Sequence, residues 1–527
     1  MRYLVILIIS VFLLNSCSNA IPEVPIEFFE DDSISLKKKM QKVLENSYLK
    51  TLGFNDSQCQ WLQNHYEKNV FKPHWINDSM VIESGIKMKT TLANSLWFGI
   101  PENRIIFSKK KNLNWVEEEV ILTAKTALIL FDLNKGFLNL KEKKYNLKYF
   151  ISSEALDSAL ALSKKQTYDE IFLQQRITDT NYQFMSSKLY SFCQTYPLDK
   201  STFDVEAFKD DSIYTIPKAT KALISKGYLD ENSKDSLKFV EAIKVFQEHN
   251  GLKKDGKVGK YTAWALNEST YDKVLRTAFV MDKLRTSMVY PSKCIRINLP
   301  EYLLRFFVND SLKQIHNIII GKTENQTPQL ESKIRNIVVY PYWKVPYSIA
   351  SKEVLPAAKR SAAYFAKNNY KLYKGKTEIN PYAVNWKRIK DETFPYQIIQ
   401  EPGPKNSLGI IKFEFYNDYS VYVHDSPAKS LFKTDIRSYS HGCMRCENPV
   451  DLGKVILDYD SVGRKRNDLT RDSLDTLLSR AENFVIHLKK PVPIYVEYNT
   501  VFADREKLIF HLDIYKRDEE YLKIMKE

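Results

Sequence analysis

The chain has 527 residues and a formal net charge of +14, from 78 lysines and arginines against 64 aspartates and glutamates. Hydrophobic residues make up 44%, which excludes global disorder, and 15 glycines and 20 prolines are too few for a fibrous or low-complexity chain. This length accommodates about two to four domains. The positive charge suits an anionic partner or simply a lysine-rich surface, and no RNP, zinc-finger or helix-turn-helix signature favours nucleic acid.

The first 17 residues have the pattern of an export signal. Arg2 is followed by an almost unbroken apolar run over residues 4–14, which is too short for a stable membrane span. Small residues then precede Cys17, in a pattern that resembles the signal of lipoproteins. The resemblance implies that the chain is cut before Cys17 and that its thiol is acylated. An ordinary cleaved signal peptide is the alternative.

A tether and a helical region follow. Residues 18–35 combine prolines and acidic residues with little periodicity, and we expect them to form the tether. Residues 36–200 show mainly helical periodicity and predict a helical scaffold domain without a catalytic pattern. One face of its clearest helix is formed by Val120, Ala124, Ala127, Leu128 and Phe131.

Residues 203–270 form a distinct segment. An amphipathic stretch containing Phe246 and Gln247 ends at Asn250-Gly251, an Asp255-Gly256 turn follows, and a further helix is expected near Thr262. The pattern closely resembles the small three-helix peptidoglycan-binding module found beside many cell-wall enzymes. A generic helix-turn-helix piece is the alternative.

The periodicity changes to two from Cys294 onward. Strand patterns occur at residues 296–308, 315–320, 334–340, 410–416, 421–424 and 492–498. Residues 351–391 interrupt them with a lysine- and tyrosine-rich stretch of helical character, as a lid insertion would. The chain is therefore expected to be an α+β multidomain protein, with a mainly-β domain over residues 290–500 and a C-terminal segment over 501–527.

The residues that carry chemistry lie in this last domain. The run Ser-Tyr-Ser-His-Gly-Cys-Met-Arg occupies residues 438–445, and Tyr-Val-His-Asp lies just upstream. A thiol needs a base because the thiolate is the nucleophile, so Cys443 and His424 are the candidate pair. Gly442 permits close approach of the backbone to a substrate carbonyl, and nearby N–H groups are candidate oxyanion donors. Arg445 is a candidate ligand for a substrate carboxylate.

These motifs resemble the YkuD-type L,D-transpeptidases. Longer stretches at residues 341–356, 400–415, 421–432 and 512–518 resemble the larger YcbB-like branch, which has a helical scaffold, an inserted wall-binding module and a lid. The resemblance implies that Cys443 attacks a tetrapeptide stem and that His424 activates it. It implies supporting roles for Ser440, His441, Gly442 and Arg445, and no metal or other cofactor. The expected product is a 3→3 peptidoglycan crosslink.

Cys446 departs from the family pattern, in which an aliphatic residue is usual. It creates a C-x-x-C with Cys443. Three interpretations stay open: a small buried residue, a regulatory disulfide, or a zinc site with His441 and both cysteines.

The sequence thus predicts a lipid-anchored acyltransferase on the periplasmic side of the envelope, with the outer membrane as the expected anchor. Its partner is peptidoglycan, both as donor and as acceptor, and not nucleic acid. A hydrolase acting on the same bonds is the first alternative, because sequence does not reveal whether the acceptor groove excludes water. A non-catalytic wall-binding lipoprotein is the second alternative.

Overall fold

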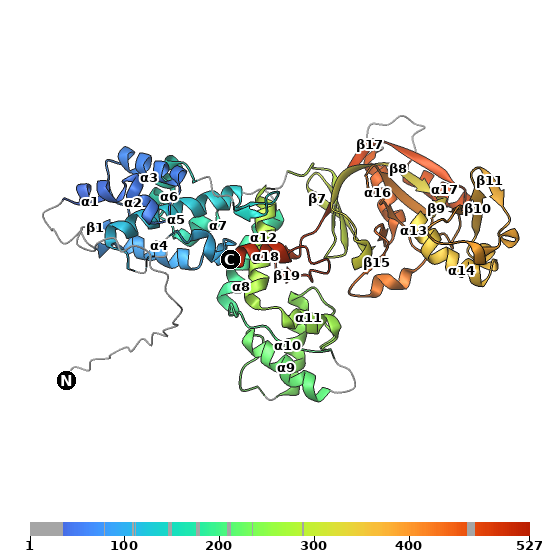
Figure 1. Cartoon of the computed structure of the whole chain (residues 1–527), viewed down its shortest axis with the longest axis horizontal. Coiled ribbons are helices and arrows are strands. Elements are labelled where there is room, and N and C mark those ends of the chain that lie inside the picture. The colour runs from blue at the N-terminus through green and yellow to red at the C-terminus, as the bar shows by residue number, and fades with distance from the viewer. Residues whose placement is uncertain are drawn as a thin grey trace. The chain divides into compact units, whose positions relative to one another are not determined.

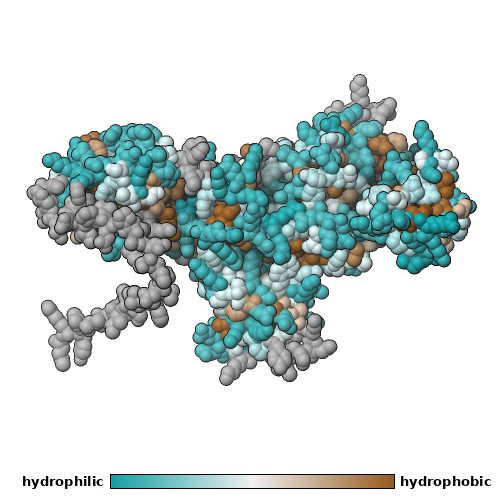
Figure 2. All heavy atoms as spheres, in the orientation of Figure 1, coloured by the Kyte–Doolittle hydropathy of each residue, from teal (hydrophilic) through white to brown (hydrophobic). Residues whose placement is uncertain are grey.

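The computed structural model describes residues 35–77, 80–107, 110, 112–145, 150–174, 180–207, 212–233, 235–286, 289–460 and 470–527. The predicted signal and the lipidation site at Cys17, with nearly all of the tether, lie outside these residues. Within them, no helix combines the length and the apolarity needed to cross a membrane. Hydrophilic residues cover most of the face seen in Figure 2, with apolar patches scattered between them.

The chain divides into two compact units, the first comprising residues 1–86 and 107–124. The Asn55 side chain accepts a hydrogen bond from the Gln58 N–H at 3.0 Å, and the Gln58 side chain accepts one from the Asn55 N–H at 3.0 Å, which starts α3. The buried Glu119 carboxylate accepts from the Tyr66 hydroxyl and from the Trp75 N–H. Its elements are α1 (Leu36–Val43), α2 (Asn46–Thr51), α3 (Asp56–Lys68), β1 (Ile76–Asn77), β2 (Met80–Val81) and the starts of α4 (Glu83–Ala93) and α5 (Trp115–Lys135).

The second unit begins with further scaffold helices. The buried Asp282 carboxylate accepts hydrogen bonds from the N–H groups of Phe137 and Leu138, and Arg104 pairs with Asp132 at 2.7 Å. The elements are η2 (Ser95–Phe98), η3 (Glu102–Ile105), β3 (Leu138–Asn139), β4 (Lys144–Tyr145), α6 (Ser153–Leu162), α7 (Tyr168–Leu173), α8 (Thr180–Thr195) and α12 (Thr270–Thr286). The C-terminal α18 (Glu519–Lys526) packs on α12 (Figure 1).

The predicted module folds as α9 (Ser212–Ser225), α10 (Ser236–His249) and α11 (Lys260–Asn267), a small bundle in Figure 1. Buried Gln247 organises the turn after α10: its amide donates to Asp255 Oδ1 and Thr262 Oγ1, and its carbonyl accepts from the Gly256 N–H at 2.9 Å. Gly256 has a φ of 71°, a backbone conformation that favours glycine. The glutamine and the turn glycine noted in the sequence therefore act together.

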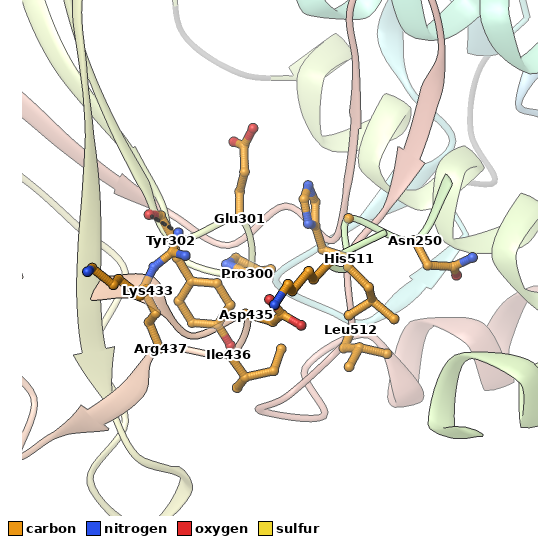
Figure 3. A pocket seen from close by; sticks show the side chains of 13 residues that line it. Asn250, Pro300, Glu301, Tyr302, Lys433, Asp435, Ile436, Arg437, His511 and Leu512 are labelled. Atoms are coloured by element: carbon orange, nitrogen blue, oxygen red, sulfur yellow. Dashed lines mark hydrogen bonds between the residues drawn. The ribbon is translucent and has the colours of Figure 1, made fainter. Parts of the chain in front are cut away.

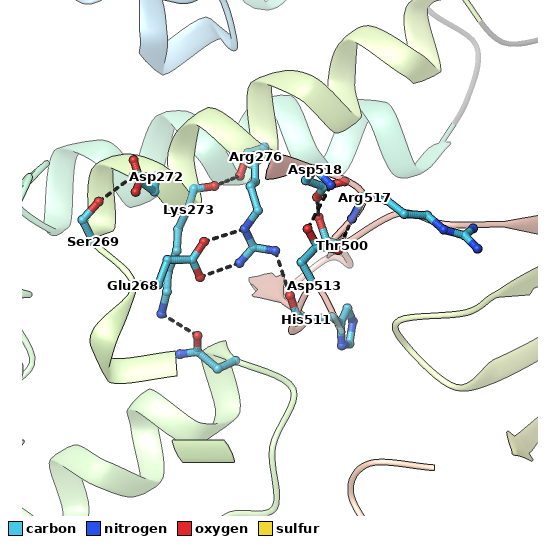
Figure 4. A network of polar contacts seen from close by, with 12 residues as sticks. Glu268, Ser269, Asp272, Lys273, Arg276, Thr500, His511, Asp513, Arg517 and Asp518 are labelled. Atoms are coloured by element: carbon cyan, nitrogen blue, oxygen red, sulfur yellow. Dashed lines mark hydrogen bonds and ion pairs between the residues drawn. The ribbon is translucent and has the colours of Figure 1, made fainter. Parts of the chain in front are cut away.

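A polar network fixes the end of the module to α12 and to the C-terminal segment (Figure 4). Arg276 pairs with Glu268 through two bonds of 2.7 and 2.8 Å and also donates to the His511 carbonyl at 2.8 Å. Buried Lys273 donates to Asn250 Oδ1 at 2.6 Å. The network holds the turn at residue 250 and the backbone of His511 in place.

The mainly-β domain is a sheet closed on itself. Among the described residues, nine strands run in the order β15-β7-β16-β14-β13-β8-β17-β5-β6, and β6 also pairs with β7. Closure leaves β15 as a short appendage on β7. The strands are β5 (Cys294–Asn298), β6 (Leu303–Val308), β7 (Ser311–Gly321), β8 (Leu330–Val339), β13 (Ile411–Phe415), β14 (Val423–His424), β15 (Ser438–Ser440), β16 (Met444–Cys446) and β17 (Phe484–Glu497).

Helices and a C-terminal hairpin complete this domain. Leu452 and Ile456 of α16 (Pro449–Asp460) and Leu474 of α17 (Arg471–Arg480) belong to the same core as Val423 and Met444. That face of the sheet is therefore buried. The short helices are η4 (Thr323–Asn325) and η8 (Lys429–Lys433), and the hairpin strands are β18 (Val501–Ala503) and β19 (Leu508–Phe510).

The insertion between β8 and β13, here called the lid (residues 343–408), is larger than predicted. It has its own core, around Trp343, Phe365 and Leu408. The expected helical character of residues 351–391 is present, but the expectation of no strands there was wrong, because β10 and β11 of an antiparallel sheet β11-β10-β12-β9 lie in that range. The elements are β9 (Trp343–Lys344), α13 (Tyr347–Ile349), the π-helix η5 (Ala350–Val354), α14 (Leu355–Arg360), α15 (Ala363–Lys367), β10 (Tyr370–Lys374), β11 (Thr377–Ile379), η6 (Pro381–Ala383), η7 (Trp386–Arg388) and β12 (Gln397–Gln400).

Candidate active site

The cysteine motif forms a tight loop between β15 and β16. The Ser440 hydroxyl accepts from the Gly442 N–H at 3.1 Å and donates to the Cys443 carbonyl at 2.5 Å. Thr327 Oγ1 donates to the Gly442 carbonyl at 2.8 Å. Gly442 has a φ of 117°, a conformation that side chains other than glycine rarely adopt. Ser440 and Gly442 therefore shape the loop that presents Cys443.

The strand register brings the predicted pair to one face of the sheet. β14 and β16 are parallel, with Val423 opposite Met444 and His424 opposite Arg445. Val423 and Met444 are fully buried in the core. Because side chains alternate along a strand, His424 lies on the opposite face from the core, together with Cys443 and Arg445.

Both members of the pair are uncharged in this state. His424 is 4% exposed, and burial lowers the pKa of its imidazole to about 3, with a further contribution from the nearby Arg445 charge. Burial also raises the pKa of the Cys443 thiol above its usual value of 9.0. His424 Nδ1 has no hydrogen-bond partner among the described residues. At pH 7 the site therefore holds a neutral imidazole and a protonated thiol on the same face of the sheet.

Tyr422 is a further candidate residue of the site that the sequence reasoning missed. Its side chain hydrogen-bonds to Cys443, and this contact lowers the thiol pKa against the larger effect of burial. Lys412 lies 4.2 Å above the Tyr422 ring and contributes in the same direction. The signal was present in the sequence, since residues 422 and 424 share a face of any strand that contains both.

The predicted oxyanion donors need a correction. The Gly442 N–H donates a hydrogen bond to the Ser440 hydroxyl, so it is not free to bind a substrate oxygen. The Cys443 N–H has no hydrogen-bond acceptor among the described residues. The Cys443 N–H and the Tyr422 hydroxyl are therefore the available donors.

His441 and Arg445 differ in their surroundings. His441 Nε2 pairs with Glu353 Oε1 of the lid helix η5 at 2.6 Å, so its side chain joins the catalytic loop to the lid. Arg445 is half-buried and forms no ion pair with any acidic side chain in the part of the chain that the structure describes. Its guanidinium is thus open to a carboxylate ligand, as the sequence suggested.

Cys446 is a packing residue. It lies in extended strand β16, is fully buried, and its thiol donates to the Glu447 carbonyl at 3.4 Å. Three residues of strand separate the Cα atoms of Cys443 and Cys446 by about 10 Å, beyond the roughly 7 Å that a disulfide bridges. Their side chains also point to opposite faces of the sheet. Of the three interpretations of Cys446, a disulfide with Cys443 and a shared zinc ion do not fit this geometry.

Comparisons with known proteins agree on the class of domain. Residues 292–462 match the family model of the YkuD L,D-transpeptidase catalytic domain, and residues 216–266 match that of a "Putative peptidoglycan binding domain". A Haemophilus influenzae protein named "Putative L,D-transpeptidase" is 28% identical over 225 residues, which is 42% of this chain and 44% of the relative. The chain thus spans less than half of the length of the curated relative it matches.

Solved structures give weaker likenesses. An L,D-transpeptidase (Yku) from Stackebrandtia nassauensis aligns at 15% identity over 57% of this chain and 98% of its own, with a TM-score of 0.19. A Ldtfm-avibactam carbamoyl enzyme aligns at 12% identity over 40% and 49%, with a TM-score of 0.18. TM-scores this low do not support an overlay of the folds, so the assignment rests on the family matches.

Proposed function

We propose that the protein forms 3→3 crosslinks in peptidoglycan, because residues 292–462 match the model of the YkuD L,D-transpeptidase catalytic domain and residues 216–266 match that of a peptidoglycan-binding domain. The donor is a tetrapeptide stem, cut before its terminal D-Ala. The acceptor is the side-chain amine of a second stem. The observation that carries the proposal is the register of β14 and β16, which puts His424 and Arg445 side by side on the face away from the core, with Tyr422 and Cys443 one residue before each strand.

The proposed first step is acylation. The Cys443 thiol gives its proton to His424 as the sulfur attacks the carbonyl carbon of the stem. The Tyr422 hydroxyl and the Cys443 N–H stabilise the oxyanion of the tetrahedral intermediate. The intermediate collapses to a thioester, and D-Ala leaves with the proton held by His424. Because burial lowers its pKa, the His424 imidazole is neutral at pH 7 and has a lone pair that can accept the proton.

The second step is deacylation by an amine. The acceptor amine attacks the thioester carbon, loses a proton to His424, and the sulfur leaves as a thiolate that takes the proton back. Water in place of the amine would give a hydrolase. The His441–Glu353 contact supports transfer over hydrolysis, because a lid held against the catalytic loop limits access of water to the thioester.

Arg445 is proposed to bind a carboxylate of the stem, and Ser440 and Gly442 to hold the loop. The basic composition suits a polymer rich in carboxylates. We further propose that Cys17 is lipidated and holds the enzyme at the outer membrane. Metabolic labelling with an alkyne fatty acid should tag the wild type and not Cys17→Ala.

The decisive experiment incubates the full chain with purified tetrapeptide muropeptides and analyses the products by mass spectrometry. Crosslinked dimers that have lost one D-Ala would support the proposal. Tripeptide monomers alone would identify a hydrolase. Absence of any product or acyl-enzyme would identify a wall-binding protein without activity.

A further inference from the structure

A pocket of about 410 Å³, here called the Tyr422 pocket, adjoins the candidate active site, because Tyr422 hydrogen-bonds to Cys443 and also lines the pocket. The rest of its wall comes from β8 (residues 335–336), β13 (412 and 414–415) and the turn after β13 (416–417 and 420–421). Another pocket, of about 370 Å³, lies beside the peptidoglycan-binding module (Figure 3), but none of its lining residues belongs to the candidate active site. A ligand in the Tyr422 pocket would therefore lie close to the nucleophile.

The lid leaves the Tyr422 pocket accessible. The structure describes all of residues 343–408, and none of them lines this pocket. β13 begins directly after the lid, and the pocket starts at Lys412, opposite His424, and follows the strand away from the lid. The catalytic loop meanwhile contacts the lid through His441 and Glu353. A second ligand can therefore enter the Tyr422 pocket while the lid rests on the catalytic loop.

Most charges in the pocket wall compensate one another. Lys412 Nζ pairs with Glu414 Oε1 at 2.8 Å and lies 4.2 Å above the Tyr422 ring, and Glu414 Oε2 accepts from Asn336 at 3.3 Å. Arg335, in contrast, is exposed and forms no ion pair with any acidic side chain among the described residues. Its guanidinium is therefore the group of this wall that remains available to a carboxylate.

A β-bulge gives Arg335 its place in the wall. The register of β8 and β13 pairs Asn336 with Glu414 and Ile334 with Phe415, which leaves Arg335 as an extra residue of β8. In a regular strand, successive side chains point to opposite faces. Because the bulge interrupts this alternation, Arg335 and Asn336 both line the pocket.

The turn after β13 is a preformed part of the wall. The Asn417 carbonyl oxygen accepts from the N–H groups of Tyr419 and Val421 at 3.1 and 3.0 Å. Its amide donates to the carbonyls of Phe415 and Val421 at 3.1 and 2.7 Å. A wall fixed by its own hydrogen bonds loses little conformational entropy when a ligand binds.

We propose that the Tyr422 pocket binds the acceptor, with Arg335 on the carboxylate that neighbours its attacking amine. This inference rests on the proposed function, in which a second stem supplies the amine. The donor is already attached to Cys443 in the second step, so the ligand that needs a site of its own is the acceptor. When an amine and a carboxylate share one carbon, holding the carboxylate on Arg335 also restricts the position of the amine. The ligand class is thus an amino-acid group rather than a simple amine.

The test measures crosslinked product by mass spectrometry as the acceptor concentration varies, with a tetrapeptide stem as the donor at saturation. The acceptor is a tripeptide stem, which has no terminal D-Ala to lose, either native or amidated at the carboxylate beside its side-chain amine. For the wild type, amidation should raise the acceptor KM about threefold to tenfold, as expected for the loss of a solvent-accessible bidentate contact. Arg335→Gln should raise the KM of the native acceptor by the same factor and should no longer distinguish the two acceptors.

The matched control is Lys333→Gln, which removes an exposed cation of the same strand that does not line the pocket. This variant should keep the wild-type preference for the native acceptor. Thermal melting establishes that both variants are folded.

Acyl-enzyme formation from the donor alone separates this inference from the proposed function. A wild type that crosslinks both acceptors with the same KM, or an Arg335→Gln enzyme with an unchanged KM, would overturn the acceptor site alone. If Arg335→Gln slows acylation by the donor as much as it weakens use of the acceptor, the arginine serves the donor and the inference fails. A wild type that forms no acyl-enzyme, or only hydrolyses it, would overturn the proposed function.

Discussion

Replacing Tyr422 with phenylalanine tests whether its hydroxyl serves the reaction. The change removes a single oxygen atom that contacts the Cys443 thiol and leaves the ring in place. Loss of one oxyanion donor typically lowers a rate by about 10²–10³. Stability should change by only about 1 kcal/mol, because a single hydrogen bond is lost from a half-buried side chain. The thiol pKa should rise, because the contact with Tyr422 lowers it.

The assay is the rate of carbapenem acylation, followed by intact mass as a function of pH. Tyr422→Phe should be slower by the stated factor at pH 7 and should require a higher pH for its half-maximal rate. The matched control is Tyr439→Phe, which changes an exposed tyrosine of β15 whose hydroxyl donates to Thr434. A Tyr422→Phe enzyme that is acylated as fast as the control would refute this role.

Three further predictions concern neighbouring residues. Cys446→Val should retain activity. After mild oxidation, dithiothreitol should restore the same fraction of activity in the wild type and in this variant, because Cys446 is too far from Cys443 to form a disulfide with it. Glu353→Gln should raise the ratio of hydrolysed to crosslinked product, by at most about fivefold, since a partly exposed side-chain contact such as that with His441 contributes about 0.2–1 kcal/mol; an unchanged ratio would contradict the role proposed for the His441–Glu353 contact. Wild-type acylation should rise steadily between pH 6 and 9 as the thiol ionises, and an inflection near pH 6.5 would show that His424 titrates normally.

The same histidine makes a prediction about stability. A folded-state pKa below the unfolded value of 6.5 means that the unfolded chain binds the proton more readily. His424 therefore lowers stability as pH falls below 6.5, by about 1.4 kcal/mol per pH unit, until the folded pKa is reached. Urea unfolding at pH 7 and pH 5 should show a smaller loss in His424→Asn than in the wild type. Equal losses would contradict the burial of a neutral imidazole.

Short-range patterns in the sequence were enough to predict most of the fold. Alternating residues located the strands, and the buried Gln247 with its glycine turn identified the module. The lid was misjudged because its strands are short and pair only with one another, so no long alternation marks them. The motif located Cys443 and His424, but only the strand register shows which neighbours share their face. That register places the Cys446 side chain in the core, on the face opposite His424.

Mass spectrometry of the full chain with a defined disaccharide-tetrapeptide tests the central claim most directly. The proposal predicts a wild-type acyl-enzyme whose mass lacks D-Ala and whose label maps to Cys443. It also predicts crosslinked dimers at longer times, and neither species with Cys443→Ala. An adduct that persists on Cys443→Ala, or dimers formed without a Cys443 thioester, would contradict it.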